Sequence, residues 1–202
     1  MEDFSGSSAR ILLTAFLLTS FGLIMVYSSS WAYSDYHYGN SYFLLLKQSV
    51  AAVLGFASLF FLAKVSIDMI IDYSGYLLAG FVLLTLFTLI PSFSTEGRWL
   101  DLGPLSFQPT EGLKFGLIIW TSLAVVDLGD RIKDFRRGIV PFLIVMGGIS
   151  FLTLLQPDFS MTVLLVTSVG FILFVGGARL VDLGKVIALA VPLLGGLLVM
   201  EP

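Results

Sequence analysis

Glu111 and Lys114 are three residues apart at the start of an apolar segment. On a helix this spacing places both side chains on one face, so the carboxylate and the ammonium group can pair. Pro109 or Thr110 would begin the helix, and Glu111 in its first turn would complement the positive end of the helix dipole. Two interpretations stay open: an ion pair that fixes the start of the helix, or a polar cluster that orients a phosphate or tunes a neighbouring acid.

Arg98 and Gln108 lie in the polar stretch before this segment, which begins with the sequence GRWLDLG over 97–103. Ionisable groups beside hydrocarbon are costly, so they are functional candidates. The planar guanidinium of Arg98 suits a pyrophosphate or a carboxylate. It could equally hold the stretch together by bonding to backbone carbonyls, Glu96 or Asp101.

Gln156, Pro157 and Asp158 occupy a short turn between two other apolar segments. Pro157 breaks a helix and Asp158 can cap the next one, and capping is the favoured explanation. The alternative is that this turn lines a polar cavity at the level of Glu111. Lys47, one turn inside an earlier apolar segment, could face that cavity too, although an ammonium group reaching back to water explains it more simply.

The sequence gives little support for a metal site or for nucleic-acid binding. His37 is the only histidine and there is no cysteine, which excludes a multi-histidine or thiolate metal site. The chain has no glycine-rich phosphate loop, no Ser/His/Asp set and no basic tract for nucleic acid. We therefore expect no metal site and no nucleic-acid partner.

The elements that must position these residues are membrane helices. Hydrophobic residues make up 57% of the chain and charged residues 12%, against roughly 25% charged in soluble domains. Crossing about 30 Å of hydrocarbon takes roughly 20 helical residues. This predicts an all-α, polytopic membrane bundle forming one domain over residues 1–202. The seven predicted spans are Ile11–Tyr27, Phe43–Ala63, Met69–Ile90, Glu111–Val126, Gly138–Leu155, Phe159–Val175 and Leu183–Met200.

Basic residues predict the orientation of the bundle. With the N-terminus inside, eight of the 11 basic residues fall on the inner side and three on the outer side. The positive-inside rule therefore favours N-in and C-out. Two outer connections stand out: 28–42 is rich in aromatic residues typical of the membrane interface, and 92–110 is long enough to form a structured polar loop that suits a polar substrate.

Three motifs closely resemble the SEDS family (shape, elongation, division and sporulation) in order and spacing: GRWLDLG over 97–103, FQPTEGLK over 107–114 and QPDF over 156–159. The family usually has Ser where this chain has Thr110, which keeps the hydroxyl. The sequence MVYSSS over 25–30 also resembles the family's opening, and the pattern leans toward the division branch over the elongation branch.

The resemblance implies a bacterial peptidoglycan glycosyltransferase. Such an enzyme polymerises lipid II at the outer face of the cytoplasmic membrane, in cell division or in the maintenance of cell shape. Its partners would be a class B penicillin-binding protein and other membrane proteins of the division or elongation machinery. The implied fold has about ten helices long enough to cross a bilayer, so this chain is expected to be the amino-terminal part of a longer protein.

The resemblance also implies residue roles. Glu111 and Lys114 match a buried ion pair near the family's active cavity, and Arg98 matches its loop arginine. The family's catalytic aspartate lies beyond Pro202, so no residue of this chain is assigned as the base. Cofactors stay undetermined, and a divalent cation would suit the chemistry. The supporting residues expected are Glu111, Lys114 and Arg98, and the substrate-binding residues expected are Arg98, Gln108, Lys114, Gln156, Asp158 and Lys47.

Two other function classes stay open at this stage. A transporter that flips a lipid-linked precursor would also use buried charges in a multi-span fold. However, the inner halves of the predicted spans offer little charge to line a path. A non-catalytic scaffold of a division complex is the third hypothesis, because a chain without the catalytic base could still bind partners.

Overall fold

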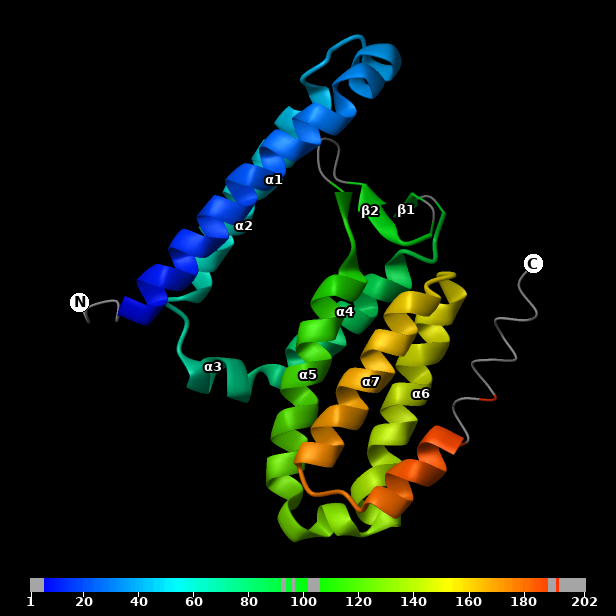
Figure 1. Ribbon diagram of the computed structural model, residues 1–202. Coiled ribbons are helices and arrows are strands. Elements are labelled where there is room, and N and C mark those ends of the chain that lie inside the picture. The colour runs from blue at the N-terminus through cyan, green and yellow to red at the C-terminus, as the bar shows by residue number, and fades with distance from the viewer. Residues whose placement is uncertain (1–5, 92–93, 96, 102–105, 189–191, 193–202) are drawn as a thin grey trace. The chain divides into compact units, whose positions relative to one another are not determined.

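The computed structural model of the protein describes residues 6–91, 94–95, 97–101, 106–188 and 192. Helices make up most of this part of the chain, as predicted (Figure 1). The chain forms two compact units, Met1–Val65 and Ser66–Pro202. A single membrane domain over residues 1–202 stays a prediction.

The first unit is a hairpin of two long apolar helices, α1 (Gly6–Tyr38) and α2 (Phe43–Leu62). The two helices run side by side, as Figure 1 shows. The rings of Phe16 and Phe56 meet between them with centroids 6.1 Å apart. Each helix is long enough to cross a bilayer, which requires roughly 20 residues.

The predicted aromatic connection over 28–42 is wrong in its bounds, because α1 continues to Tyr38. Ser29 and Ser30 donate their hydroxyl hydrogens to the carbonyl of Val26 at 3.3 and 2.6 Å. These hydroxyls are thus satisfied within the helix and do not break it. Gly39, with φ of +63°, follows the last turn in the left-handed conformation that glycine adopts at low cost.

The helices of the second unit pack against one another, the polar connection lies at one end of them (Figure 1), and a further helical segment covers residues 180–188. A 3₁₀ turn (η1) and a π turn (η2) link α5 to α6. The bounds are α3 Ile67–Asp72, α4 Ser74–Phe87, α5 Pro109–Leu128, η1 Gly129–Lys133, η2 Phe135–Ile139, α6 Val140–Leu155 and α7 Phe159–Val175.

The third predicted span, 69–90, is interrupted at Tyr73, which separates α3 from α4. Asp68 and Asp72 make α3 too polar to lie in hydrocarbon without cost. The apolar part of this region therefore begins only with α4, and the prediction placed its start too early.

Four helices in the described part of the chain are long and apolar enough to cross a membrane. They are Ser8–Tyr38, Phe43–Leu62, Pro109–Lys133 and Phe135–Leu155. The helices Ser74–Phe87 and Phe159–Val175 are apolar but shorter. Of the seventh predicted span, residues 183–188 are helical, and most of the remainder lies outside the described residues. The count of seven spans stays a prediction.

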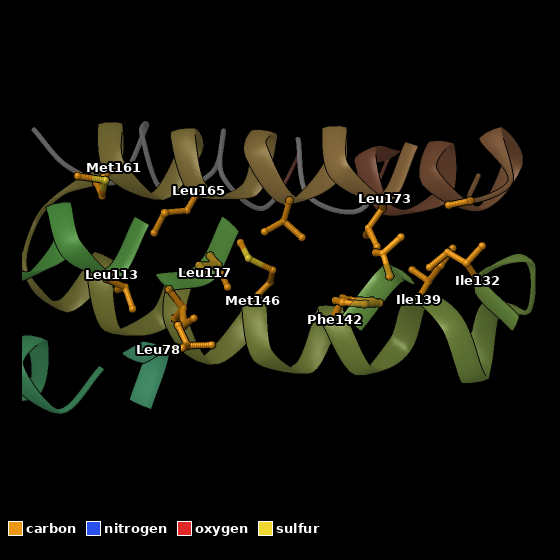
Figure 2. Packing of buried hydrophobic residues seen from close by; sticks show 14 residues of the cluster. Leu78, Leu113, Leu117, Ile132, Ile139, Phe142, Met146, Met161, Leu165 and Leu173 are labelled. Atoms are coloured by element: carbon orange, nitrogen blue, oxygen red, sulfur yellow. The ribbon is translucent and has the colours of Figure 1, made fainter. Parts of the chain in front are cut away.

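The core of the second unit lies between α4, α5, α6 and α7. Figure 2 shows labelled side chains from these helices pointing toward one another. Leu113, Leu117 and Leu165 are almost completely buried at its centre. In a membrane such packing is held by van der Waals contact more than by a hydrophobic driving force, so close fit matters.

Gly112 and Gly116 allow α4 and α5 to approach closely. A Cβ on Gly116 would lie 3.2 Å from the backbone Cα of Leu78, and a Cβ on Gly112 would overlap the ring of Phe81 at 2.0 Å. Small residues spaced by four are typical of helices that pack tightly in lipid. This contact matters for the site because α4 and α5 carry the two ends of the polar connection.

Candidate functional site

The polar connection between α4 and α5 contains a small antiparallel sheet in which Trp99 pairs with Thr95 and Leu100 with Phe107. The sequence predicted a structured loop here but no strands, because strands this short leave no alternating pattern. Glu96 lies outside the described residues. The strands are β1 Ser94–Thr95, β2 Trp99–Asp101 and β3 Ser106–Phe107.

Arg98 lies in the turn between β1 and β2, directly after Gly97, whose φ is +69°. Its side chain is half-buried. A guanidinium that is partly shielded from water interacts more strongly with an anion than one in bulk solvent. The placement therefore suits a group that meets a phosphate at the edge of the sheet.

Glu111 and Lys114 form the pair that their spacing predicts, with Lys114 Nζ 2.6 Å from Glu111 Oε2. The α5 helix begins at Pro109, which places Glu111 in its first turn as expected. Lys114 is 22% exposed and Glu111 is 50% exposed within the described residues. A buried pair near an active cavity stays a prediction. Lys114 Nζ also lies 5.7 Å from the ring centroid of Phe115.

Gln108 and Asp158 are brought together from different parts of the chain. Nε2 of Gln108 donates a hydrogen bond to Oδ2 of Asp158 at 3.1 Å. The other oxygen of Asp158 accepts from the backbone N–H of Met161 at 3.0 Å and so caps α7, as predicted. Gln108 is itself the residue that precedes α5, and its side chain bonds across to Asp158 without capping its own helix.

Gln156 is completely buried at the end of α6. Its Nε2 donates to the carbonyl of Thr85 at 3.1 Å and to the hydroxyl of Thr88. This placement favours a role inside the protein over the predicted contact with substrate. Sequence reasoning missed Thr85 and Thr88 as partners, because threonines inside an apolar segment give no signal of what they bond.

Threonine hydroxyls occupy the same end of the bundle. Oγ1 of Thr153 and Oγ1 of Thr162 are 2.7 Å apart and link α6 to α7. The hydroxyl of Thr110 is also buried, yet it has no hydrogen-bond partner among the described residues. A buried hydroxyl without a partner is uncommon and costs stability.

Lys47 is exposed on α2. It belongs to the unit Met1–Val65, whereas the other candidate residues belong to the unit Ser66–Pro202. Its role in substrate binding stays a prediction.

The second unit also contains an apolar groove. The groove, of about 590 Å³, is bounded by α6, α7 and residues 180–188. Phe142, Met146 and Phe174 are typical of its lining, and none of its lining residues is titratable. It therefore offers no acid–base chemistry. No group of three metal-ligating side chains occurs among the described residues either.

Almost the whole chain matches a known protein family. The model of the FtsW/RodA/SpoVE family, described as a cell cycle protein family, matches residues 8–202. The chain belongs to this family. It is the SEDS family that the three sequence motifs resemble, so that prediction is confirmed.

Named SEDS relatives come from several bacteria. Probable peptidoglycan glycosyltransferase FtsW of Nitrosomonas europaea is 35% identical over 195 residues, which cover 94% of this chain and 50% of the relative. Stage V sporulation protein E of Bacillus subtilis is 30% identical over 174 residues, which cover 84% of this chain and 47% of that relative. The chain spans about half the length of the curated relatives it matches. The recurrence of FtsW among the relatives supports the division branch.

The fold agrees with a solved SEDS structure. A crystal structure of a variant of the rod shape determining protein RodA from Thermus thermophilus matches with a TM-score of 0.56 and 26% identity. The match covers 85% of this chain and 58% of that chain. Together with the long apolar helices, this makes the chain a multi-pass membrane protein.

Proposed function

We propose that this chain is part of a bacterial peptidoglycan glycosyltransferase that polymerises lipid II in cell division. The observation that carries the proposal is the ion pair of Glu111 and Lys114 at the start of α5, directly after the sheet that bears Arg98. Two cationic groups at one end of a helix bundle suit a pyrophosphate leaving group. The names of the FtsW relatives support the same reaction.

In the proposed reaction a sugar 4-hydroxyl attacks the anomeric carbon of a second lipid-linked unit. The new C–O bond forms as the bond to undecaprenyl pyrophosphate breaks, and a base takes the hydroxyl proton. Arg98 and Lys114 stabilise the negative charge that grows on the pyrophosphate. Glu111 holds the Lys114 ammonium in place through the 2.6 Å contact. We assign no base within residues 1–202, and a divalent cation would stabilise the same charge.

The proposal includes a membrane context. Seven spans with the N-terminus inside would bring the α4–α5 connection and the turn at Asp158 to the outer face of the cytoplasmic membrane. Helices of roughly 20 apolar residues and the basic loop over 130–137 support this orientation. The proposed partners are a class B penicillin-binding protein that crosslinks the new strands and other division or elongation proteins.

Charge reversal in the full-length gene product tests the proposal. Glu111→Lys and Lys114→Glu should each abolish polymerisation of purified lipid II, because each places two like charges where the pair now lies. The amount of protein in the membrane should not change, since an exposed ion pair contributes only about 0–1 kcal/mol to stability. Chain length on gels measures the first result and quantitative immunoblotting of membranes the second.

Asp130→Lys is the matched control. It breaks an equally spaced ion pair, between Asp130 and Lys133 at 2.7 Å, at the other end of α5. It also adds positive charge to the loop proposed to lie on the inner side of the membrane, where positive charge favours the same orientation of the chain. Polymerisation should survive this change. Wild-type chain growth by both reversals at 111 and 114 would refute the assigned roles, and translocation of labelled lipid II without chain growth would favour the transporter.

A further inference from the structure

Gln156 joins the end of α6 to the end of α4. Its amide nitrogen donates to the carbonyl of Thr85 and to the hydroxyl of Thr88, and all three residues are completely buried. The last four carbonyls of a helix have no partner within it, and Thr85 is in the last turn of α4. Thr88 Oγ1 donates one hydrogen bond to this carbonyl, and Gln156 supplies a second donor from another helix, at a completely buried position.

Asp158 makes the corresponding bond to α5. Its Oδ2 accepts from Gln108, which comes immediately after β3 and immediately before α5. Its Oδ1 caps α7 through Met161, so the carboxylate is held from both sides. The position of Gln108 is thus set by a residue fixed at the start of another helix.

Thr88 ends α4 and Gln108 precedes α5, so these two residues are the roots of the connection that carries β1, β2 and β3. The strands fix one another through their pairing, but that pairing does not fix the sheet to the bundle. We propose that the turn 156–158 is a clamp that holds both roots and thereby positions Arg98 and the start of α5. Gln156 and Asp158 are then positioning residues.

The clamp rests on the proposed function only for its effect on catalysis, because Arg98 and Lys114 are the groups that it would aim at the substrate. Gln156 is 0% exposed and its amide nitrogen is engaged by α4, so it acts through the connection. Its Oε1 has no partner among the described residues, which leaves Nε2 as the atom that carries the link.

Substitutions at position 158 can distinguish three roles of Asp158: its bond with Gln108, its cap on α7 and its negative charge. Asp158→Ser keeps a good helix cap but is too short to reach Gln108. Asp158→Asn keeps the cap and removes the charge, and it preserves the bond to Gln108 if the amide of Gln108 turns over to accept. A positioning role therefore predicts that Ser is impaired and Asn is not.

Gln156→Leu removes the other half of the clamp in a variant that should still fold. The carbonyl of Thr85 keeps the hydrogen bond from Thr88 Oγ1 at 2.8 Å, so no buried carbonyl loses every partner. Leu also removes the unpartnered Oε1. Because the Thr85 carbonyl and the Thr88 hydroxyl keep the hydrogen bond between them, neither is left without a partner, and the loss of stability should be small.

The experiment measures amide hydrogen exchange and lipid II polymerisation in the same full-length preparations. Gln156→Leu and Asp158→Ser should speed exchange in β2 and β3 and lower kcat about fivefold, the effect of one ordinary hydrogen bond, with α7 still protected. Asp158→Asn should stay within about twofold of wild type in both measurements.

Unchanged exchange in β2 and β3 for both Gln156→Leu and Asp158→Ser would overturn the clamp. Loss of polymerisation by Asp158→Asn with normal exchange would also overturn it, because the carboxylate charge would then act on the substrate directly. Faster exchange as expected, in a protein whose wild type does not polymerise lipid II, would uphold the clamp and refute the proposed function.

Discussion

Gln108 donates a hydrogen bond to Asp158 across 50 residues of chain, at 3.1 Å. Both residues stand at the start of a helix, Gln108 before α5 and Asp158 before α7. The bond therefore ties two helix starts together at one end of the bundle. The ion pair of Glu111 and Lys114 begins in the first turn of α5, directly after this link.

Gly116→Val should destabilise the protein because it forces α4 away from α5. Even a Cβ at this position would lie 3.2 Å from the backbone of Leu78, which cannot move aside as a side chain could. Overpacking of this kind costs about 1–3 kcal/mol, measured as a lower midpoint of thermal unfolding in detergent. Gly147→Ala is the control, since nothing lies within 4 Å of its added Cβ. Equal midpoints for the two variants would contradict the close approach.

Lys185→Met should destabilise the protein more than Lys133→Met, although both remove the lysine of a 2.7 Å pair with aspartate. Asp182 is 8% exposed and would be left buried without its partner, whereas Asp130 is 93% exposed and stays in water. The first variant should lose about 1–3 kcal/mol of stability, and the second should be close to neutral because water screens its exposed pair. Denaturant titration of the purified variants measures both losses of stability. A larger loss for Lys133→Met than for Lys185→Met would show that burial of the aspartate does not determine the cost.

Thr153→Val and Thr110→Val remove buried hydroxyls that differ in one respect. The hydroxyl of Thr153 is bonded to that of Thr162, and the hydroxyl of Thr110 has no partner in the described part of the chain. Thr153→Val should cost about 1 kcal/mol, and Thr110→Val should be neutral or stabilising. Thermal unfolding of the two variants side by side gives the comparison. A destabilised Thr110→Val would indicate a partner for that hydroxyl.

Local features of this chain follow from its sequence because they depend on residues close together along it. The pairing of Glu111 with Lys114, the start of α5 at Pro109 and the capping of α7 by Asp158 each rest on a spacing of a few residues. The apolar segments likewise predict helices, although two boundaries differ. Serines that bond within α1 let that helix continue, and Tyr73 separates the aspartate-containing α3 from α4. The motifs also sufficed to predict the family.

Tertiary structure alone decided which of these elements meet. A helix in a membrane is apolar all round, so its sequence carries no polar face to indicate which side packs against a neighbour. Small residues such as Gly116 let neighbouring helices fit closely, and the packing of the four helices brings Gln156 to Thr85 and Gln108 to Asp158. Such bonds join residues 50 to 71 positions apart, and no local rule relates them. The sequence thus determined the helices and the pair at 111 and 114, and packing in three dimensions decided how one turn holds both ends of the connection that bears Arg98.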